Sequence, residues 1–238
     1  MSEISYTKFL DYFTYYKGEP HQKEGIKQLY EGIKDEFNVL NVDAVWMDTY
    51  SKPSTPPAPV VPVVPSEYLL AVPYQYQNDN TSGTGYRECF SSTCAMVAMY
   101  YKKVANDDEY NRVRARYGDT TDANAQVKAL TSLGLDVEFR TDGTEKILED
   151  LIALNRPVPV GWLHYGTPSN PVGGGHWTIL TGFSPNSFVF NDPYGEADLV
   201  NGGYLNYSKG QGIIYSRKNW VPRWRVRGTG GWYIRVNS

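Results

Sequence analysis

The 238-residue sequence predicts an α+β protein in which a helix layer packs on an antiparallel sheet, preceded by a small helical module. Helical patterns dominate residues 89–155, and strand patterns rich in β-branched and aromatic residues dominate from residue 156 onward. A proline-rich stretch separates this larger part from about fifty N-terminal residues of helical pattern. Helices followed by antiparallel strands are typical of the α+β class.

Composition narrows the class of protein. Hydrophobic residues make up 41% and charged residues 21% of the chain, which fits a globular protein with a proper core. The net charge of −3 gives no indication of a nucleic-acid partner, although residues 1–50 carry −4 and the segment Lys209–Ser238 carries +7. Two cysteines and no apolar run of 18 residues argue against a disulfide scaffold and against membrane insertion.

Residues 1–50 are predicted to form a small helical bundle. Apolar residues recur at helical spacing in two runs that are separated by Lys17–Pro20, and a short third piece covers residues 43–50. We expect either a structural or docking module, or one that targets a cell wall or a virion, with His21 in a structural role. The acidic, amphipathic start does not resemble a secretory signal peptide, so synthesis in a host cytoplasm is expected.

Residues 51–67 are predicted to be a linker. Six prolines at short intervals exclude a helix and favour polyproline II, a semi-rigid spacer of about 3.1 Å per residue. The domain boundaries are therefore 1–50, 51–67 and 68–238. Within the last unit the expected helices follow Cys89 and cover 106–117, 122–133 and 144–155. Residues 72–80 are expected to form a short strand that runs into a polar loop, and further strands are expected at 135–143, 156–166, 176–183 and 188–195.

The tail Asn219–Val236 alternates arginine with tryptophan, valine and isoleucine. As a strand it would present one basic face to anionic wall polymers. The alternative is an edge strand that its charges protect from pairing with other chains.

Cys89 is predicted to begin a helix, because a glycine-rich polar stretch precedes it and the apolar block Cys94–Tyr101 follows it. Free backbone N–H groups and the helix dipole favour a thiolate at such a position. The alternative is that Cys89 is an unreactive, buried small residue. Cys94 lies inside the apolar block and is expected in the core. A disulfide between the two is disfavoured, because five residues of helix rise roughly 7.5 Å.

His176 and Asp192 are predicted to lie opposite each other across a hairpin that turns at residues 184–187. Pairing of Gly182 with Asn186 would place residue 176 against residue 192, with Cβ atoms about 5 Å apart. A carboxylate behind an imidazole fixes its tautomer and supports a nucleophilic thiol. His164 is the competing histidine, either as the base or as a strand residue beside the cleft.

Three segments resemble the C39-like peptidases: GYRECFSSTCAMVAMYY (85–101), GGGHWTILTGF (173–183) and VFNDPYG (189–195). The resemblance implies a papain-like cysteine peptidase fold, with Cys89 as nucleophile, His176 as base and then acid, and Asp192 orienting the ring. It also implies that Gln77, with Gln75 as the alternate, helps to form the oxyanion hole. The chain departs from the family pattern in having Phe-Ser-Ser after the cysteine and a longer gap between Gln77 and Cys89.

The resemblance implies amide hydrolysis through a thioacyl intermediate. Three dispersed histidines and two cysteines give no ligand spacing for zinc, and no phosphate loop or dinucleotide fingerprint appears, so neither a metal nor an organic cofactor is expected. The predicted function is a phage-type peptidoglycan endopeptidase, an endolysin, that acts on the cell wall after release or as part of a virion. The partners expected are a peptide or peptidoglycan substrate, with wall polymers bound by residues 1–50 or by the basic tail. The alternatives are a peptidase that processes proteins or leader peptides, and a catalytically inactive wall-binding or tail-associated protein that has kept the fold.

Overall fold

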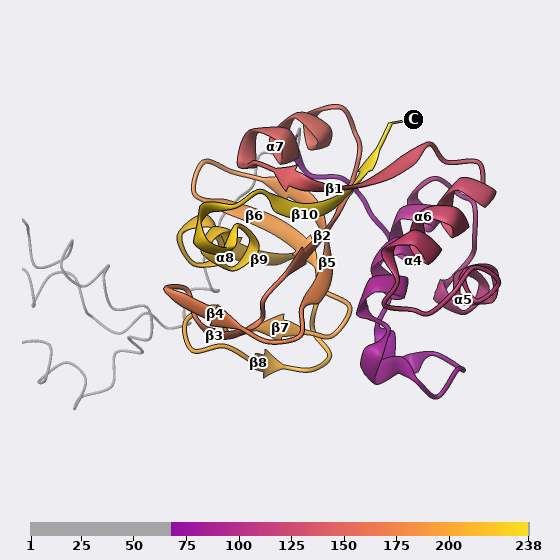
Figure 1. Ribbon diagram of the computed structural model, residues 1–238, viewed down its shortest axis with the longest axis horizontal. Coiled ribbons are helices and arrows are strands. Elements are labelled where there is room, and N and C mark those ends of the chain that lie inside the picture. The colour runs from indigo at the N-terminus through magenta and orange to yellow at the C-terminus, as the bar shows by residue number, and fades with distance from the viewer. Residues whose placement is uncertain (1–67, 238) are drawn as a thin grey trace, which may run out of the picture. The chain divides into compact units, whose positions relative to one another are not determined.

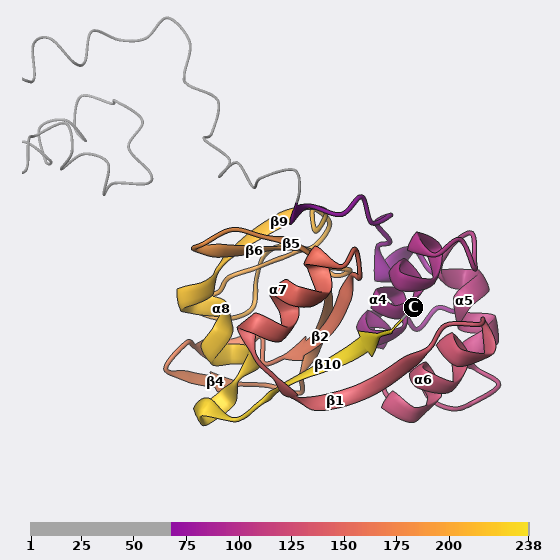
Figure 2. The same cartoon turned by 90° about the horizontal axis from the view of Figure 1, so that it is seen from above.

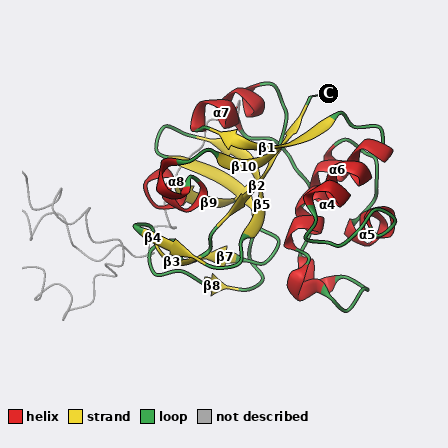
Figure 3. Cartoon of the chain, viewed as in Figure 1, coloured by secondary structure: helices red, strands yellow, loops and turns green. Residues whose placement is uncertain are grey.

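The computed structural model describes residues 68–237. The predictions for the helical module at 1–50 and for the linker at 51–67 therefore lie outside the described residues. Over the described part, helices pack on a sheet of antiparallel strands, which confirms the predicted α+β class (Figures 1 and 3).

Three helices gather on one side of the sheet: α4 (Cys89–Tyr100), α5 (Asp107–Arg114) and α6 (Ala123–Ser132) (Figures 1 and 2). The first turns of α5 and α6 are fixed by local capping, as when Asn106 Oδ1 accepts a hydrogen bond from Glu109 N at 2.9 Å. On the other side lie α7 (Glu145–Ala153) and α8 (Arg217–Trp224). The helices predicted after Cys89 and at 106–117, 122–133 and 144–155 are all present, each shorter by a few residues.

The main sheet has six strands in the order β1-β10-β2-β5-β6-β9, and every neighbouring pair is antiparallel. Their bounds are β1 (Val137–Gly143), β2 (Val158–Trp162), β5 (His176–Phe183), β6 (Ser187–Asn191), β9 (Ile213–Ser216) and β10 (Gly231–Val236). Two small hairpins stand beside it, β3 (Tyr165–Thr167) with β4 (Asn170–Val172) and β7 (Glu196–Ala197) with β8 (Tyr204–Asn206). Short 3₁₀ turns are η2 (Gln77–Asp79), η3 (Gly85–Arg87) and η4 (Val226–Gly228).

Helix α4 is the centre of the core. Every residue from Phe90 to Ala98 is buried, because the helix packs against β5 and β2 while α5 and α6 cover its outer side. The Phe90 ring stacks on Trp177 of β5 with ring centroids 3.6 Å apart, and Thr93 Oγ1 donates to the Trp177 carbonyl at 3.0 Å. These contacts fix the start of α4 against the start of β5, where Cys89 and His176 lie.

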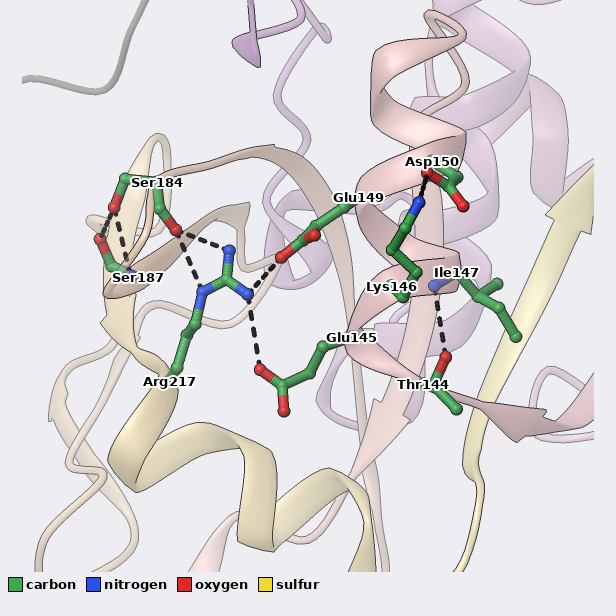
Figure 4. Close-up of polar contacts among 9 residues, drawn as sticks. All are labelled: Thr144, Glu145, Lys146, Ile147, Glu149, Asp150, Ser184, Ser187 and Arg217. Carbon is green, nitrogen blue, oxygen red and sulfur yellow. Dashed lines mark hydrogen bonds and ion pairs between the residues drawn. The ribbon is translucent and has the colours of Figure 1, made fainter.

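Arg217, the first residue of α8, ties the other side of the sheet together (Figure 4). Its guanidinium donates to the Ser184 carbonyl and pairs with Glu145 and Glu149 of α7. It also lies over the Phe188 ring, 4.1 Å from the centroid. Two helices and the β5–β6 turn are thereby held by one side chain.

The prediction for the basic tail is wrong. Residues 217–224 form a helix that contains Pro222, and only residues 231–236 form a strand. That strand, β10, lies between β1 and β2, so it is an inner strand and neither an edge strand nor an exposed basic face. Neighbours that are distant in sequence supply its hydrogen bonds, and the local alternation carries no information about them.

Two strand predictions were too long and one is absent. The run at 156–166 divides into β2 and β3 with a break at Leu163 and His164, and the run at 188–195 ends at Asn191. Residues 72–80 form no strand; upstream of them, Leu69 makes an isolated bridge to Gly182.

No helix in the described range 68–237 is long and apolar enough to cross a membrane.

Candidate active site

Cys89 is the first residue of α4 and is partly exposed. The first helical hydrogen bond in this turn runs from Ser92 N to the Glu88 carbonyl, so the N–H groups of residues 89–91 have no partner within the helix. Their partial positive charge favours an anion at the cysteine sulfur. Both cysteines are free, and Cys94 is fully buried, as the sequence predicts.

His176 and Asp192 are in direct contact. Nε2 of the imidazole lies 2.7 Å from Asp192 Oδ1, and both side chains are buried. Burial lowers the pKa of His176, but the Asp192 carboxylate and the neighbouring Cys89 thiol outweigh it and raise that pKa to about 10. Because Nε2 faces the carboxylate, Nδ1 is the ring nitrogen left for the thiol of Cys89.

The predicted register of this hairpin is wrong, although its two residues do meet. Gly182 pairs with Val189, not with Asn186, and a bulge at Thr181 changes the pairing to Leu180 with Phe190. The bulge shifts the register by one residue, which brings positions 176 and 192 back to the same face as diagonal neighbours. The two side chains extend toward each other and form the 2.7 Å contact between His176 Nε2 and Asp192 Oδ1.

Four further contacts hold Asp192. Oδ1 accepts from the backbone N–H of Tyr194 at 2.9 Å, and Oδ2 accepts from the Tyr215 hydroxyl at 3.2 Å. The Asp192 N–H donates to the Gly210 carbonyl at 2.7 Å, and the Asp192 carbonyl accepts from the Tyr74 hydroxyl at 3.2 Å. A carboxylate that is fixed in this way orients the imidazole without reorganisation.

Gln77 lies between the turn that carries Asp192 and the turn that precedes Cys89. Its backbone N–H donates to the Pro193 carbonyl at 2.8 Å, and its Nε2 donates to the Gly85 carbonyl at 2.7 Å. One N–H of the amide therefore stays free, since a glutamine amide carries two donors. Among the described residues no hydrogen bond joins Gln77 to Cys89 or His176.

Gln75, the alternate for the oxyanion hole, is engaged elsewhere. Its Oε1 accepts from the Asp107 backbone N–H at 3.0 Å, and its Nε2 donates to the Tyr74 carbonyl at 2.8 Å. Each of the two amides therefore keeps one N–H without a partner, and the assignment of Gln77 to the oxyanion hole stays a prediction.

His164, the competing histidine, lies next to the site in a different environment. Its ring centroid is 5.5 Å from that of His176, and its buried Nδ1 has no hydrogen-bond partner among the described residues. Burial and the nearby charges of His176 and Arg223 lower the pKa of His164 to about 4, so it is neutral at pH 7. Among residues 68–237 no carboxylate forms a hydrogen bond with His164 that would orient it as a base.

A buried carboxylate, which the sequence did not single out, precedes the cysteine. Glu88 accepts hydrogen bonds from the side chains of Asn80, Thr84 and Asn111, and closes the loop of residues 80–88 on α5. Asn80 and Thr84 lie in the eight residues before Glu88, and only Asn111 is distant in sequence, 23 residues away.

A cavity of about 560 Å³ opens beside Cys89. Trp177 and Trp232 line it, and so does the loop Gly173–Gly175 that leads into His176. A Cβ atom built on Gly174 or Gly175 would meet no other atom within 4 Å, so a substrate main chain can approach this wall closely. Among residues 68–237 no group of three or more His, Cys, Asp or Glu side chains is arranged to hold a metal ion.

The family model described as papain-like cysteine protease AvrRpt2 matches residues 67–202, which is more than half of the chain. No curated protein matches.

Several solved structures are similar to the chain. They include the peptidase domain of Streptococcus ComA, a bifunctional ABC transporter involved in quorum sensing (17% identity, 63% of this chain and 91% of that one, TM-score 0.44). A protein assigned as a C39-like peptidase from Bacillus anthracis shares 14% identity over 72% of this chain and 97% of its own, with a TM-score of 0.49. The double-glycine-motif protease of an AMS/PCAT transporter, solved with a leader peptide, shares 19% identity over 71% and 93%, with a TM-score of 0.44.

Proposed function

This chain belongs to the papain-like cysteine protease family of AvrRpt2 and is a cysteine peptidase. We propose that its substrate is peptidoglycan and that it works as an endopeptidase through Cys89, His176 and Asp192. The family match confirms the predicted papain-like fold and cysteine peptidase class. The observation that carries the mechanism is the buried contact of 2.7 Å between His176 Nε2 and Asp192 Oδ1, with the Cys89 thiol on the other side of the ring.

In the proposed reaction the Cys89 sulfur attacks the scissile carbonyl and forms a C–S bond. The oxyanion binds to the free N–H of the Gln77 amide and to the backbone N–H of Cys89 at the start of α4. His176 holds the thiol proton as an imidazolium and gives it to the leaving amine as the C–N bond breaks. Water, deprotonated by His176, then hydrolyses the thioacyl group and frees Cys89.

Two features support a wall peptide as the substrate. The open wall at Gly174 and Gly175 leaves room for the main chain of a peptide that is built from small residues, as stem peptides and crossbridges are. The sequence also places the peptidase behind a proline-rich spacer and an acidic module, an organisation suited to an enzyme that works on an insoluble polymer.

The second candidate is a peptidase that processes polypeptides. The family description itself favours it, because it names a protease. This candidate predicts cleavage of soluble proteins and no effect on walls.

The test is turbidity clearance of purified bacterial walls by the wild type, by Cys89→Ala and by Cys94→Ala, each with and without a thiol alkylator. Clearance by the wild type and Cys94→Ala, abolished by Cys89→Ala and by alkylation, is the expected result. Labelling of Cys89 without any clearance would support the polypeptide substrate instead. If neither labelling nor clearance occurs, the proposed mechanism is wrong.

A further inference from the structure

Five aromatic rings form a continuous surface on and beside the two small hairpins, β3–β4 and β7–β8. We call this surface the tyrosine platform; it consists of His164, Tyr165, Tyr194, Tyr204 and Tyr207. Neighbouring ring centroids lie 4.1 Å apart for His164 and Tyr165, 5.8 Å for His164 and Tyr204, 4.8 Å for Tyr194 and Tyr204, and 5.6 Å for Tyr204 and Tyr207. Tyr165 and Tyr207 at its ends are 50% and 57% exposed.

The platform is continuous with the candidate active site. The His176 ring lies 5.5 Å from His164 and 5.7 Å from Tyr204, measured between centroids. A Cβ atom on Gly173, in the loop that lines the cavity of Cys89, would lie 2.9 Å from the Tyr165 ring. A polymer that lies across the platform therefore passes the entrance to the catalytic groups.

A buried arginine makes the platform rigid. The Arg223 guanidinium, which is fully buried, donates to the carbonyls of Leu163, Tyr165, Gly166 and Leu199. The hairpins also touch directly, since the Gly203 N–H donates to the His164 carbonyl at 2.8 Å. Figure 1 shows the two hairpins side by side. Short hairpins are marginal on their own, so this fixation preorganises an exposed surface.

The platform suits an uncharged ligand. Residues 163–175 contain no charged side chain. In the β7–β8 hairpin, Glu196 accepts a hydrogen bond from Asn206, and Asp198 accepts from Asn201. Nucleic acids and anionic wall polymers would find little charge here to bind. Tyrosine rings offer flat apolar faces with a polar edge, which match the C–H faces and hydroxyl rims of sugar rings.

Two polar atoms within the platform lack partners. Nδ1 of His164 and the hydroxyl of Tyr204 are buried and make no hydrogen bond with any described residue. Leaving such groups unpaired is costly, so an ordered water is expected to complete them. Both groups are neutral at pH 7, because burial lowers the pKa of His164 to about 4 and raises that of Tyr204 far above its usual range.

We propose that the tyrosine platform binds the glycan strand of peptidoglycan, with Tyr165 and Tyr207 stacking on its amino sugars, while the attached peptide enters the cavity at Cys89. This inference rests on the proposed function, because it names the part of the same substrate that the peptidase does not cut. It makes the platform a substrate-binding surface and gives its residues no part in bond cleavage.

The test uses the full chain with Cys89→Ala, so that binding is measured without cleavage. The probe is chitin oligosaccharides, uncharged chains of the N-acetylglucosamine that peptidoglycan glycan strands contain, and affinity is measured by titration calorimetry. Tyr165→Ala combined with Tyr207→Ala should weaken binding at least tenfold. Tyr165→Phe combined with Tyr207→Phe keeps the rings and should retain most of the affinity. Tyr86→Ala removes a tyrosine that is 72% exposed outside the platform, and should not change the affinity.

These measurements test glycan binding independently of whether the enzyme cuts wall peptides. Glycan binding that Tyr165→Ala with Tyr207→Ala leaves unchanged, or that Tyr86→Ala weakens equally, overturns it, even if the wild type cuts wall peptides. A platform that binds unfolded polypeptide and no glycan also overturns it. Glycan binding that depends on the two rings supports it, even if wall-peptide cleavage is absent and the proposed reaction is wrong. Melting curves of all variants check that the loss of binding is not a loss of fold.

Discussion

His176 and His164 lie 5.5 Å apart, yet their surroundings give them opposite properties. Asp192 and Cys89 raise the pKa of His176 to about 10, whereas burial without a carboxylate lowers that of His164 to about 4. Proximity to the nucleophile therefore does not make a histidine a catalytic base. The partner on the far side of the ring decides which histidine can exchange a proton with the thiol.

The largest expected effect is the loss of activity on removal of the His176 ring, compared with removal of the His164 ring. His176→Ala should lower kcat/KM by about 10⁴-fold, because the thiol then loses its base and the leaving amine its acid. His164→Ala should cost less than about 20-fold. Hydrolysis of a labelled peptide at pH 7 measures both. A larger loss for His164→Ala than for His176→Ala would reverse the two assignments.

Asp192→Asn should make His176 resemble His164 while leaving the packing intact. We expect kcat/KM to fall by about 10³-fold and the pKa of His176 to drop, because the charge that offsets burial is gone. Titration of the imidazole by NMR measures the pKa in the wild type and the variant. An unchanged pKa in Asp192→Asn would mean that the carboxylate does not control the ring.

The two histidines should give stability opposite dependences on pH. The His176 contribution is complete below its unfolded pKa of about 6.5 and is lost as pH rises toward 10, because the folded state holds the proton more tightly. The His164 contribution is lost as pH falls from about 6.5 to 4, because the unfolded state binds the proton first.

Thermal melts at pH 4 to 7 test the second part. Between these pH values the wild type should lose about 1 kcal/mol more than His164→Gln, a difference of several degrees in Tm after allowance for the partial exposure of the ring. Equal losses in both proteins would show that His164 does not titrate in this range.

The smallest effect is expected at Tyr204, whose ring contacts both histidines. Tyr204→Phe removes a buried hydroxyl that has no partner, so without ligand the free energy of unfolding should rise by up to about 1 kcal/mol. Urea denaturation measures it, with Tyr207→Phe as the exposed control. A loss of stability in Tyr204→Phe would indicate that an ordered water already completes the hydroxyl.

The helices were predictable because their signals are local. Asn106 and Asp122 cap α5 and α6 through contacts two or three residues away, and the apolar block after Cys89 is continuous in sequence. The hairpin register was not predictable, since the bulge at Thr181 depends on how β5 and β6 pack. The tail was misread because arginines that alternate with tryptophan and valine follow a strand pattern locally, while tertiary packing makes a helix at residues 217–224.

The site shows the same division. The positions of Cys89, His176 and Asp192 followed from motifs within short segments, and the structure brings His176 and Asp192 together. Tyr215 and Tyr74 could not be singled out, because they reach Asp192 from 23 and 118 residues away. Contacts of that range leave no pattern in a single sequence.

Arg223 donates its hydrogen bonds to main-chain carbonyls of the hairpins and not to their side chains. Replacement of the exposed residues of β3–β4 and β7–β8 would therefore leave its carbonyl partners in place. The backbone conformation of this surface is therefore independent of the side chains that it exposes. Substitution of Tyr165 or Tyr207 alone should then change which polymer the proposed surface binds without changing its backbone, and the same positions are suited to protein engineering.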